Sequence, residues 1–291
     1  MYVRKCLESG LQMSLGFTPA MYEASAEYIK NRLAGLSFNP EALLVLGSGL
    51  GFMADEMEEI VATIPYADIP HFRTSTAPGH KGQLVAGKLS GKMVLAMQGR
   101  LHLYEGYTAE EVAYPVRVAN LLGADKLIIS CACGGANTNY EVGDLAIITD
   151  YINFTHKSPL VGFDITGFNT RFVDMSYAYD REFIKLTKEV AAEKNIPLQE
   201  GVYFYMLGPQ FESPAEIRAI QTLGGDLVGM SAVYETVMAQ RLGMRTLGIA
   251  LVTNMAAGIL DVPLFEDEVL VVAKRASKVF SELIKAFMEK M

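Results

Sequence analysis

The alternation of apolar, strand-like runs with helix-like segments is the feature that most constrains how this chain can fold. Such runs recur along all 291 residues, and no linker, low-complexity stretch or internal repeat separates them. This alternation is typical of α/β proteins, in which helices cover both faces of a mixed or largely parallel sheet. We therefore expect one α/β domain over residues 1–291, with a twisted central sheet flanked by helices. Residues 1–17 are expected to form a peripheral N-terminal segment.

Local patterns set the expected elements. Apolar runs bounded by turn residues predict strands at 42–51 (ending in a glycine loop), 93–97, 126–135, 144–154, 201–208, 226–230 and 245–253. Apolar periodicity and capping residues predict helices at 18–35, 108–123, 180–194, 213–224, 236–242 and 269–287. Loops at the ends of such strands commonly hold ligands. The notable ones, all expected to follow strands, are GSGLG, PGH, GRLHLYEG, CACGG, GPQFE, GMS and TN.

Composition excludes several classes of protein. The formal net charge of -8 argues against a nucleic-acid or membrane-surface partner. Three cysteines without a C-x-x-C pair argue against a disulfide framework or a zinc site, and no histidine cluster has metal-ligand spacing. No signal peptide or membrane span is recognisable. We expect a cytoplasmic protein without a metal.

The segment GRLHLYEGY (99–107) places Arg100, His102 and Tyr104 directly after an apolar run. A strand-like period of two would aim all three side chains to one side, where they could bind an anion. Alternatively, they are solvated residues at the edge of a strand. The residues of this segment alone leave both interpretations open.

The remaining candidates are individually weak. GSGLG (47–51) lacks the last glycine of a dinucleotide fingerprint and the lysine of a Walker loop, so it is either a plain turn or a turn that binds one phosphate through Ser48 and backbone N–H groups. His80 lies in a turn. Cys131 and Cys133 are typical of inert buried residues. Taken singly, Phe211 and Met230 are typical of a core, Glu212 of a cap or surface, and Asn254 of a turn.

Six segments, taken in order, resemble the trimeric purine nucleoside phosphorylases of bacterial type. They are GSGLG (47–51), STAPGHKG (75–82), GRLHLYEGY (99–107), GPQFESPAE (208–216), VGMSAVYE (228–235) and TNMAAGILDVPL (253–264). The resemblance extends from about Thr18 to the C-terminal helix. It implies an enzyme that phosphorolyses 6-oxopurine (deoxy)ribonucleosides, such as inosine and guanosine, to the free base and (deoxy)ribose 1-phosphate. Phosphate would be a co-substrate, and no cofactor is expected.

The resemblance also implies roles for individual residues. Those expected to bind phosphate are Ser48, His80, Arg100, His102, Ser231 and the backbone of Ala132. Those expected to bind the nucleoside are Tyr104 and Met230 at the ribose, and Phe211, Glu212 and Asn254 at the purine. His102, Glu212 and Asn254 would be catalytic. Phe168 would cap the sugar pocket of a neighbouring subunit, which implies a homotrimer.

Glu266 is the main departure from this resemblance, because relatives carry there a histidine that contacts the ribose 5′-hydroxyl. Cys131 and Cys133 replace a usual asparagine and alanine, which should alter the shape of the pocket. One alternative function is a phosphorylase of 5′-methylthioadenosine, but such relatives have an aspartate in place of Asn254 and lack HxYEG. The other is a non-catalytic nucleoside-binding protein, which would not need the phosphate-binding residues.

Overall fold

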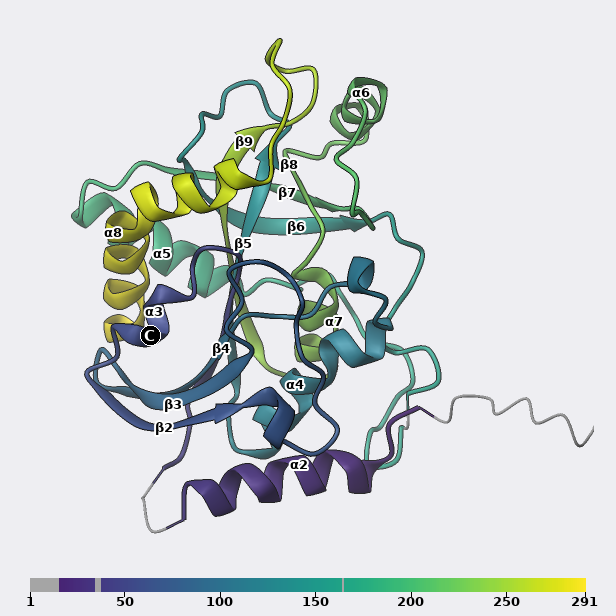
Figure 1. Cartoon of the computed structure of the whole chain (residues 1–291), viewed down its shortest axis with the longest axis vertical. Helices are drawn as coiled ribbons and strands as arrows, with labels where there is room; N and C mark the ends of the chain where they lie inside the picture. The colour runs from purple at the N-terminus through teal and green to yellow at the C-terminus, as the bar shows by residue number, and fades with distance from the viewer. Residues whose placement is uncertain (1–15, 35–37, 164) are drawn as a thin grey trace, which may run out of the picture.

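A mixed β-sheet forms the centre of the molecule (Figure 1). The computed structural model describes residues 16–34, 38–163 and 165–291, so most of the predicted peripheral segment 1–17 lies outside the described residues. The sheet has nine strands in the order β2-β3-β4-β1-β5-β8-β7-β6-β9. They are β1 (Ala42–Leu46), β2 (Glu59–Pro65), β3 (Gln83–Leu89), β4 (Lys92–Gln98), β5 (Lys126–Gly135), β6 (Leu145–Asn153), β7 (Leu198–Tyr205), β8 (Leu227–Gly229) and β9 (Arg245–Met255).

The sheet combines parallel and antiparallel pairs, which confirms the predicted mixed architecture. β1 runs parallel to β4 and β5, whereas β2, β3 and β4 form an antiparallel meander. β5 and β9 are long and pair with each other along most of their length. In addition, the end of β5 pairs with β8, and β9 pairs with β6. Strands β5, β8, β7, β6 and β9 consequently close into a ring, which the sequence did not predict.

Helices cover two sides of the sheet. They are α2 (Pro19–Arg32), α3 (Phe52–Asp55), α4 (Ala109–Leu121), α5 (Arg181–Glu193), α6 (Pro214–Thr222), α7 (Val233–Arg241) and α8 (Asp267–Lys290), with 3-10 turns η1 (Tyr66–Asp68) and η2 (Leu103–Glu105). α2, α4 and α7 pack together on one side, and α5 and α8 pack together on the other (Figure 1). Two large apolar clusters, one beneath each group, form the core.

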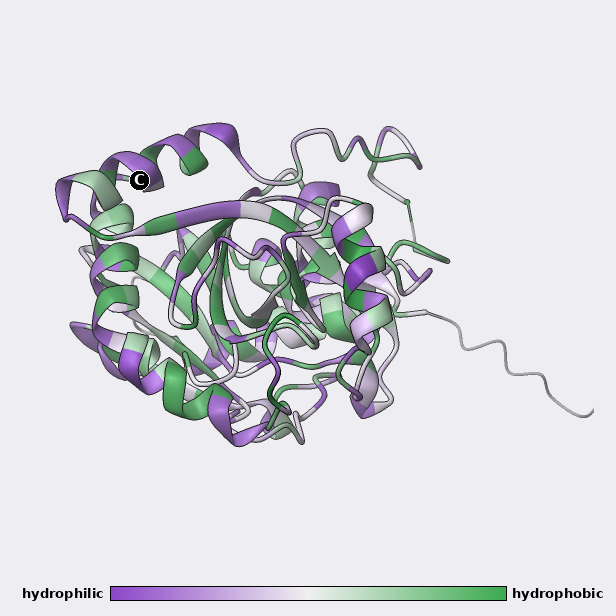
Figure 2. Cartoon of the chain, turned by 90° about the horizontal axis from the view of Figure 1, so that it is seen from above, coloured by the Kyte–Doolittle hydropathy of each residue, from purple (hydrophilic) through white to green (hydrophobic). Residues whose placement is uncertain are grey.

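The helices carry both hydrophobic and hydrophilic residues, as Figure 2 shows. α5 and α8 bury one face each, whereas eight of the nine residues of α7 are buried. The predicted capping boxes at Thr108 and Ser213 are present, and α4 continues through Pro115. Thr18 precedes α2 without a side-chain cap, although Pro19 occupies the first helical position as expected. No helix in the described part of the chain is long and apolar enough to cross a membrane.

Some predicted features differ from the structure. Strands β2 and β3 were not predicted: β2 is largely exposed and begins with a glutamate, and Gly87 and Lys88 interrupt the apolar pattern of β3. Pro78–His80 were expected to follow a strand, but they precede β3. CACGG and the Thr253-Asn254 pair belong to the strands β5 and β9 themselves and not to loops.

Candidate active site

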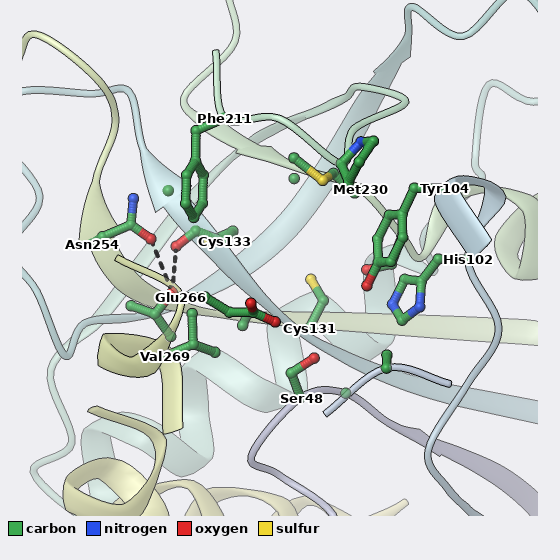
Figure 3. Close-up of a pocket in the computed structure, with 18 of the residues that line it drawn as sticks. Ser48, His102, Tyr104, Cys131, Cys133, Phe211, Met230, Asn254, Glu266 and Val269 are labelled. Atoms are coloured by element: carbon green, nitrogen blue, oxygen red, sulfur yellow. Dashed lines mark hydrogen bonds between the residues drawn. The ribbon is translucent and has the colours of Figure 1, made fainter. Parts of the chain in front are cut away.

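A cavity of about 340 Å³ opens where the ends of β1, β5, β8 and β9 meet the loop after β4 and the start of α8. Eleven of the thirteen predicted site residues line it, namely Ser48, Arg100, His102, Tyr104, Ala132, Phe211, Glu212, Met230, Ser231, Asn254 and Glu266. In Figure 3, His102 and Tyr104 approach the cavity from one side, and Phe211 and Asn254 from the other. His80 and Phe168 are the two predicted residues that do not line it.

Arg100 lies at the base of the cavity and is only 1% exposed. Its Nη2 donates to the carbonyl oxygens of Val45, at 3.2 Å, and of Ser130. Its Nε and Nη1 make no hydrogen bond. A solvated strand edge is therefore excluded for Arg100, and anion binding stays a prediction. The predicted period of two is wrong beyond His102, because Tyr104 lies in the 3-10 turn η2.

His102 is held by the glutamate three residues later. Its Nδ1 is 2.9 Å from Oε1 of Glu105, and the Glu105 carboxylate also accepts from the backbone of His102. Burial lowers the pKa of His102, and the nearby Arg100 charge lowers it further, against the opposing effect of Glu105. A neutral imidazole whose Nδ1–H faces Glu105 presents its Nε2 lone pair elsewhere. The ring stacks on Tyr104 with a centroid separation of 4.7 Å.

Ser48 sits in the glycine turn after β1, which closes with a hydrogen bond from Leu50 N–H to the Gly47 carbonyl. Gly49 has a φ of 74°, and a Cβ there would come within 2.4 Å of the Ala273 Cβ, so this turn needs glycine. The Ser48 hydroxyl lies 3.2 Å from Nε2 of His80. His80 thus stands behind Ser48 instead of lining the cavity.

His80 also contacts the backbone beside the arginine. Its Nδ1 lies 3.0 Å from the backbone nitrogen and 2.9 Å from the carbonyl oxygen of Arg100, and its ring centroid is 5.3 Å from that of His102. Burial, reinforced by the charges of His102 and Arg100, lowers the pKa of His80 to about 4.

Ser231 and Met230 connect β8 to α7. Ser231 is 7% exposed, and its backbone N–H donates to the Tyr203 hydroxyl. Met230 packs against the backbone of Gly208, which leaves no room there for a Cβ. Along β5, Cys131 and Cys133 also line the cavity, next to Ala132 (Figure 3). Burial raises the pKa of the Cys131 thiol to about 11, which agrees with the predicted inert character of this residue.

Glu212 and Asn254 form the opposite end of the cavity. Glu212 is 9% exposed, and its Oε1 is buried without a hydrogen-bond partner. Burial raises the pKa of this carboxyl, and Glu216 adds to the effect. The Asn254 side chain accepts from the Thr253 hydroxyl at 3.2 Å and donates to the Met255 carbonyl at 3.1 Å. Glu212 thus lines the cavity and has one carboxyl oxygen without a hydrogen-bond partner.

Glu266 and Asp267 border the mouth of the cavity at the start of α8. Glu266 is exposed, yet its charge acts on Tyr104. Burial, together with Glu105 and Glu266, raises the pKa of Tyr104 to about 12. The sequence did not point to Asp267, Val269 or Leu270, because the residues at the start of a helix show no pattern that separates a cavity wall from a solvent-exposed surface.

Phe168 lies away from the cavity of its own chain. It packs on Phe163, with ring centroids 5.6 Å apart, and on the guanidinium of Arg241 at 4.4 Å. The predicted contact of Phe168 with a neighbouring subunit stays a prediction. Among the described residues, no group of three or more His, Cys, Asp or Glu side chains is arranged to hold a metal ion.

Comparisons with known proteins match nearly the whole chain. A family model described as "Phosphorylase superfamily" matches residues 41–289. Purine nucleoside phosphorylase 1 of Bacillus subtilis is 50% identical over 264 residues, which are 91% of this chain and 96% of the relative. The purine nucleoside phosphorylase of Bos taurus is 38% identical over 95% of this chain and 96% of its own. The structure of the Schistosoma mansoni enzyme in complex with inosine matches with a TM-score of 0.87 and 35% identity, covering 94% of this chain and 97% of that one.

Proposed function

The chain belongs to the phosphorylase superfamily, and from that premise we propose that it is a purine nucleoside phosphorylase that transfers the pentosyl group of inosine or guanosine to inorganic phosphate. One observation carries the proposal. The same cavity holds a buried, incompletely hydrogen-bonded arginine at its base and an unpaired buried carboxylate, Glu212, beside Asn254. An anion and a purine with an N1–H are the two ligands that complete these hydrogen bonds.

The base of the cavity offers the groups that a phosphate ion needs. Arg100 supplies fixed positive charge and an Nε–H donor that makes no hydrogen bond, while Ser48 and Ser231 add hydroxyls and Ala132 adds its backbone N–H. The neutral His102 presents its Nε2 lone pair, which accepts from the protonated oxygen of hydrogen phosphate, and His80 orients Ser48 from behind. Each charge-assisted hydrogen bond contributes about 1.5–3 kcal/mol. A few such bonds offset the unfavourable field of a chain with net charge -8.

The other end of the cavity fits a 6-oxopurine. Glu212 accepts the N1–H of hypoxanthine or guanine, and Phe211 stacks on the ring. Adenine has no proton at N1, so its lone pair would face the Glu212 carboxylate. A site built for one hydrogen-bond pattern rejects the other by about 10⁴-fold. Tyr104 contacts the ribose hydroxyls between the two ends, and Met230 packs on the sugar.

Cleavage follows from charge placed at both ends of the glycosidic bond. The anomeric carbon passes through an oxocarbenium-like state, as in glycoside hydrolysis. The phosphate held by Arg100 and His102 stabilises that positive charge and then bonds to the carbon, while the bond to purine N9 breaks and its electrons move onto the base. Asn254 donates to N7, where negative charge develops, and so favours departure of the base. The transfer is redox-neutral, and we expect it to need no cofactor.

The assembly and location of the enzyme form part of the same proposal. Phe168 of one subunit is proposed to cap the sugar pocket of its neighbour in a homotrimer, and Glu266 to accept a hydrogen bond from the ribose 5′-hydroxyl. The protein is proposed to act in the cytoplasm on small molecules, without nucleic-acid or membrane partners. The net charge of -8 and the free thiols Cys131 and Cys133 support this.

The proposal is tested by incubating the purified protein with inosine in the presence and absence of inorganic phosphate. We expect hypoxanthine and ribose 1-phosphate only when phosphate is present. Consumption of inosine without phosphate would indicate a hydrolase. Preferential cleavage of 5′-methylthioadenosine would indicate the related phosphorylase, and nucleoside binding without turnover would indicate a non-catalytic protein.

A further inference from the structure

A buried ion pair lies beneath the base of the cavity. Nη1 of Arg100 is 3.6 Å from Oε1 of Glu235, and the two side chains are 1% and 3% exposed. Neither carboxylate oxygen of Glu235 makes a hydrogen bond. Glu235 does not line the cavity and has no place in the reaction described above. Its only evident partner in the described part of the chain is therefore the arginine that is proposed to bind phosphate.

Among the titratable side chains around Glu235, Arg100 is the one that carries a positive charge. The titratable side chains on which its charge also acts are Cys131, Tyr179, Tyr205 and Tyr234, all uncharged at neutral pH. A buried carboxylate that loses its cation is strongly destabilised, by about 3–5 kcal/mol. The Glu235 carboxylate and the Arg100 guanidinium consequently constrain one another's position.

Helix α7 connects this pair to the rest of the phosphate site. Glu235 lies in the first turn of α7, where the helix dipole favours a negative charge. Ser231 lies four residues earlier, on the cavity side of the same helix start. The guanidinium is therefore held from three elements, by the Val45 carbonyl of β1, the Ser130 carbonyl of β5 and the Glu235 carboxylate of α7.

We propose that Glu235 is a positioning residue that orients the Arg100 guanidinium toward bound phosphate. This inference rests on the proposed function, since it assumes that Arg100 binds phosphate. For removal of the Glu235 charge, the inference predicts a change in phosphate affinity opposite to the change expected from charge repulsion alone. A negative charge 3.6 Å from the arginine repels an incoming anion, so its removal alone would tighten phosphate binding. If orientation dominates, its removal weakens phosphate binding, because a forked donor works only when it is aimed.

The test compares Glu235→Gln with Glu235→Asp, which keeps the charge but withdraws it by one methylene. Met238→Ala is the control for stability, because Met238 is fully buried on the same helix, one turn from its start. For Glu235→Gln we expect the KM for phosphate to rise about tenfold, or about 1.4 kcal/mol, with the KM for inosine nearly unchanged. Glu235→Asp should fall between this variant and the wild type. Met238→Ala should lower the Tm and leave both KM values as they are.

Binding of inorganic phosphate alone gives a second readout, measured as the rise in Tm on titration of phosphate without nucleoside. Glu235→Gln should need about tenfold more phosphate than the wild type for the same rise. In an Arg100→Ala background, Glu235→Gln should cause no further loss. An unchanged or lower phosphate requirement in Glu235→Gln overturns the inference. If Glu235→Gln does not fold, Glu235→Asp decides by the same criterion.

The two proposals fail in different ways. A wild type that does not cleave inosine with phosphate refutes the proposed function, yet the Tm titration still reports whether Glu235 orients Arg100 toward the anion. A wild type that does cleave inosine, together with Glu235 variants that bind phosphate normally, refutes only the role of Glu235.

Discussion

Asn254 is the residue whose chemistry most directly sets the preferred base. Its amide donates to the purine, whereas an ionised carboxylate at this position can only accept, for instance from the exocyclic N6–H of adenine. We predict that Asn254→Asp raises the ratio of kcat/KM for adenosine to that for inosine by about tenfold or more. Steady-state kinetics with both nucleosides measure the ratio, with Asn254→Ala as the control that removes both donor and acceptor. Equal kcat/KM for the two nucleosides in the wild type would contradict the roles assigned to Glu212 and Asn254.

Glu266 places a carboxylate at the mouth of the cavity, where it accepts hydrogen bonds but cannot donate them. A ribose 5′-hydroxyl can donate to it, and a 5′-deoxy sugar cannot. We predict that Glu266→Ala lowers kcat/KM for inosine about tenfold and narrows the difference between inosine and 5′-deoxyinosine. Asp267→Ala is the matched control, because it removes the adjacent carboxylate of the cavity wall. If both variants have the same kcat/KM as the wild type for inosine and for 5′-deoxyinosine, Glu266 has no role at the 5′ end.

Sequence patterns identified the residues that face the cavity better than those that support them. Arg100, His102, Glu212 and Asn254 belong to motifs with a recognisable order along the chain. Glu235 ends one of these motifs, VGMSAVYE (228–235), but it stands 135 positions after Arg100, and nothing in the local pattern of α7 indicates that its side chain pairs with that arginine. Only the fold brings the two side chains together, so the pair could not be predicted from the sequence.

At the level of elements, the segments 75–82 and 99–107 form one polar unit around His80, and this unit should respond to pH. The pKa of His80 falls from 6.5 to about 4 on burial, so the unfolded chain takes up a proton before the folded protein does. Its contribution to stability is therefore complete above pH 6.5 and is lost as the pH falls toward 4. We predict that the free energy of unfolding decreases through this window, and that it decreases less steeply in His80→Gln.

Urea unfolding at a series of pH values measures these slopes, with the stability of each protein at pH 8 as its own reference. His102 has a lowered pKa as well, so some pH dependence should remain in His80→Gln. Glu105 affects the free energy of unfolding at lower pH than His80 does. Burial raises its pKa, but hydrogen bonds from His102 and Thr76 outweigh this and lower it from 4.5 to about 2, so its contribution is lost between these values. If the free energy of unfolding has the same slope against pH in the wild type and in His80→Gln above pH 4, then His80 has the same pKa in the folded and unfolded states, which would contradict the prediction.

Element prediction was accurate where a strand or helix is strongly apolar or clearly capped, and it failed at the meander. β5 was predicted with its observed bounds because eight of its ten residues are buried and the run ends in a glycine pair. β2 gains its strand conformation by pairing with β3, not from its own sequence, since only Ile64 of its seven residues is buried. Such tertiary stabilisation overrides local propensity.

At the level of the whole molecule, ring closure by β5 and β9 positions the cavity. Their pairing sets Ala132 opposite Leu251 and Gly134 opposite Asn254, so the proposed phosphate and purine ends lie on neighbouring strands. The two strands are separated by more than a hundred residues in the sequence, and a local pattern carries no information on such a pairing. The sequence therefore predicted a mixed α/β sheet correctly but not its closure.

The proposed trimer makes its own prediction, because Phe168 packs on Arg241 and Phe163 and does not line the cavity of its own chain. If Phe168 caps a neighbouring pocket, Phe168→Ala damages the site of another subunit, whereas Glu212→Gln damages the site of its own. A mixed trimer then contains intact sites, in which a Phe168→Ala subunit retains Glu212 and receives Phe168 from a Glu212→Gln neighbour. We predict that co-expression of the two variants restores activity well above the sum of the separately purified variants, and that a double variant carrying both changes does not. If each chain used its own Phe168, no mixture could assemble an intact site, and activity would stay at the sum of the parts.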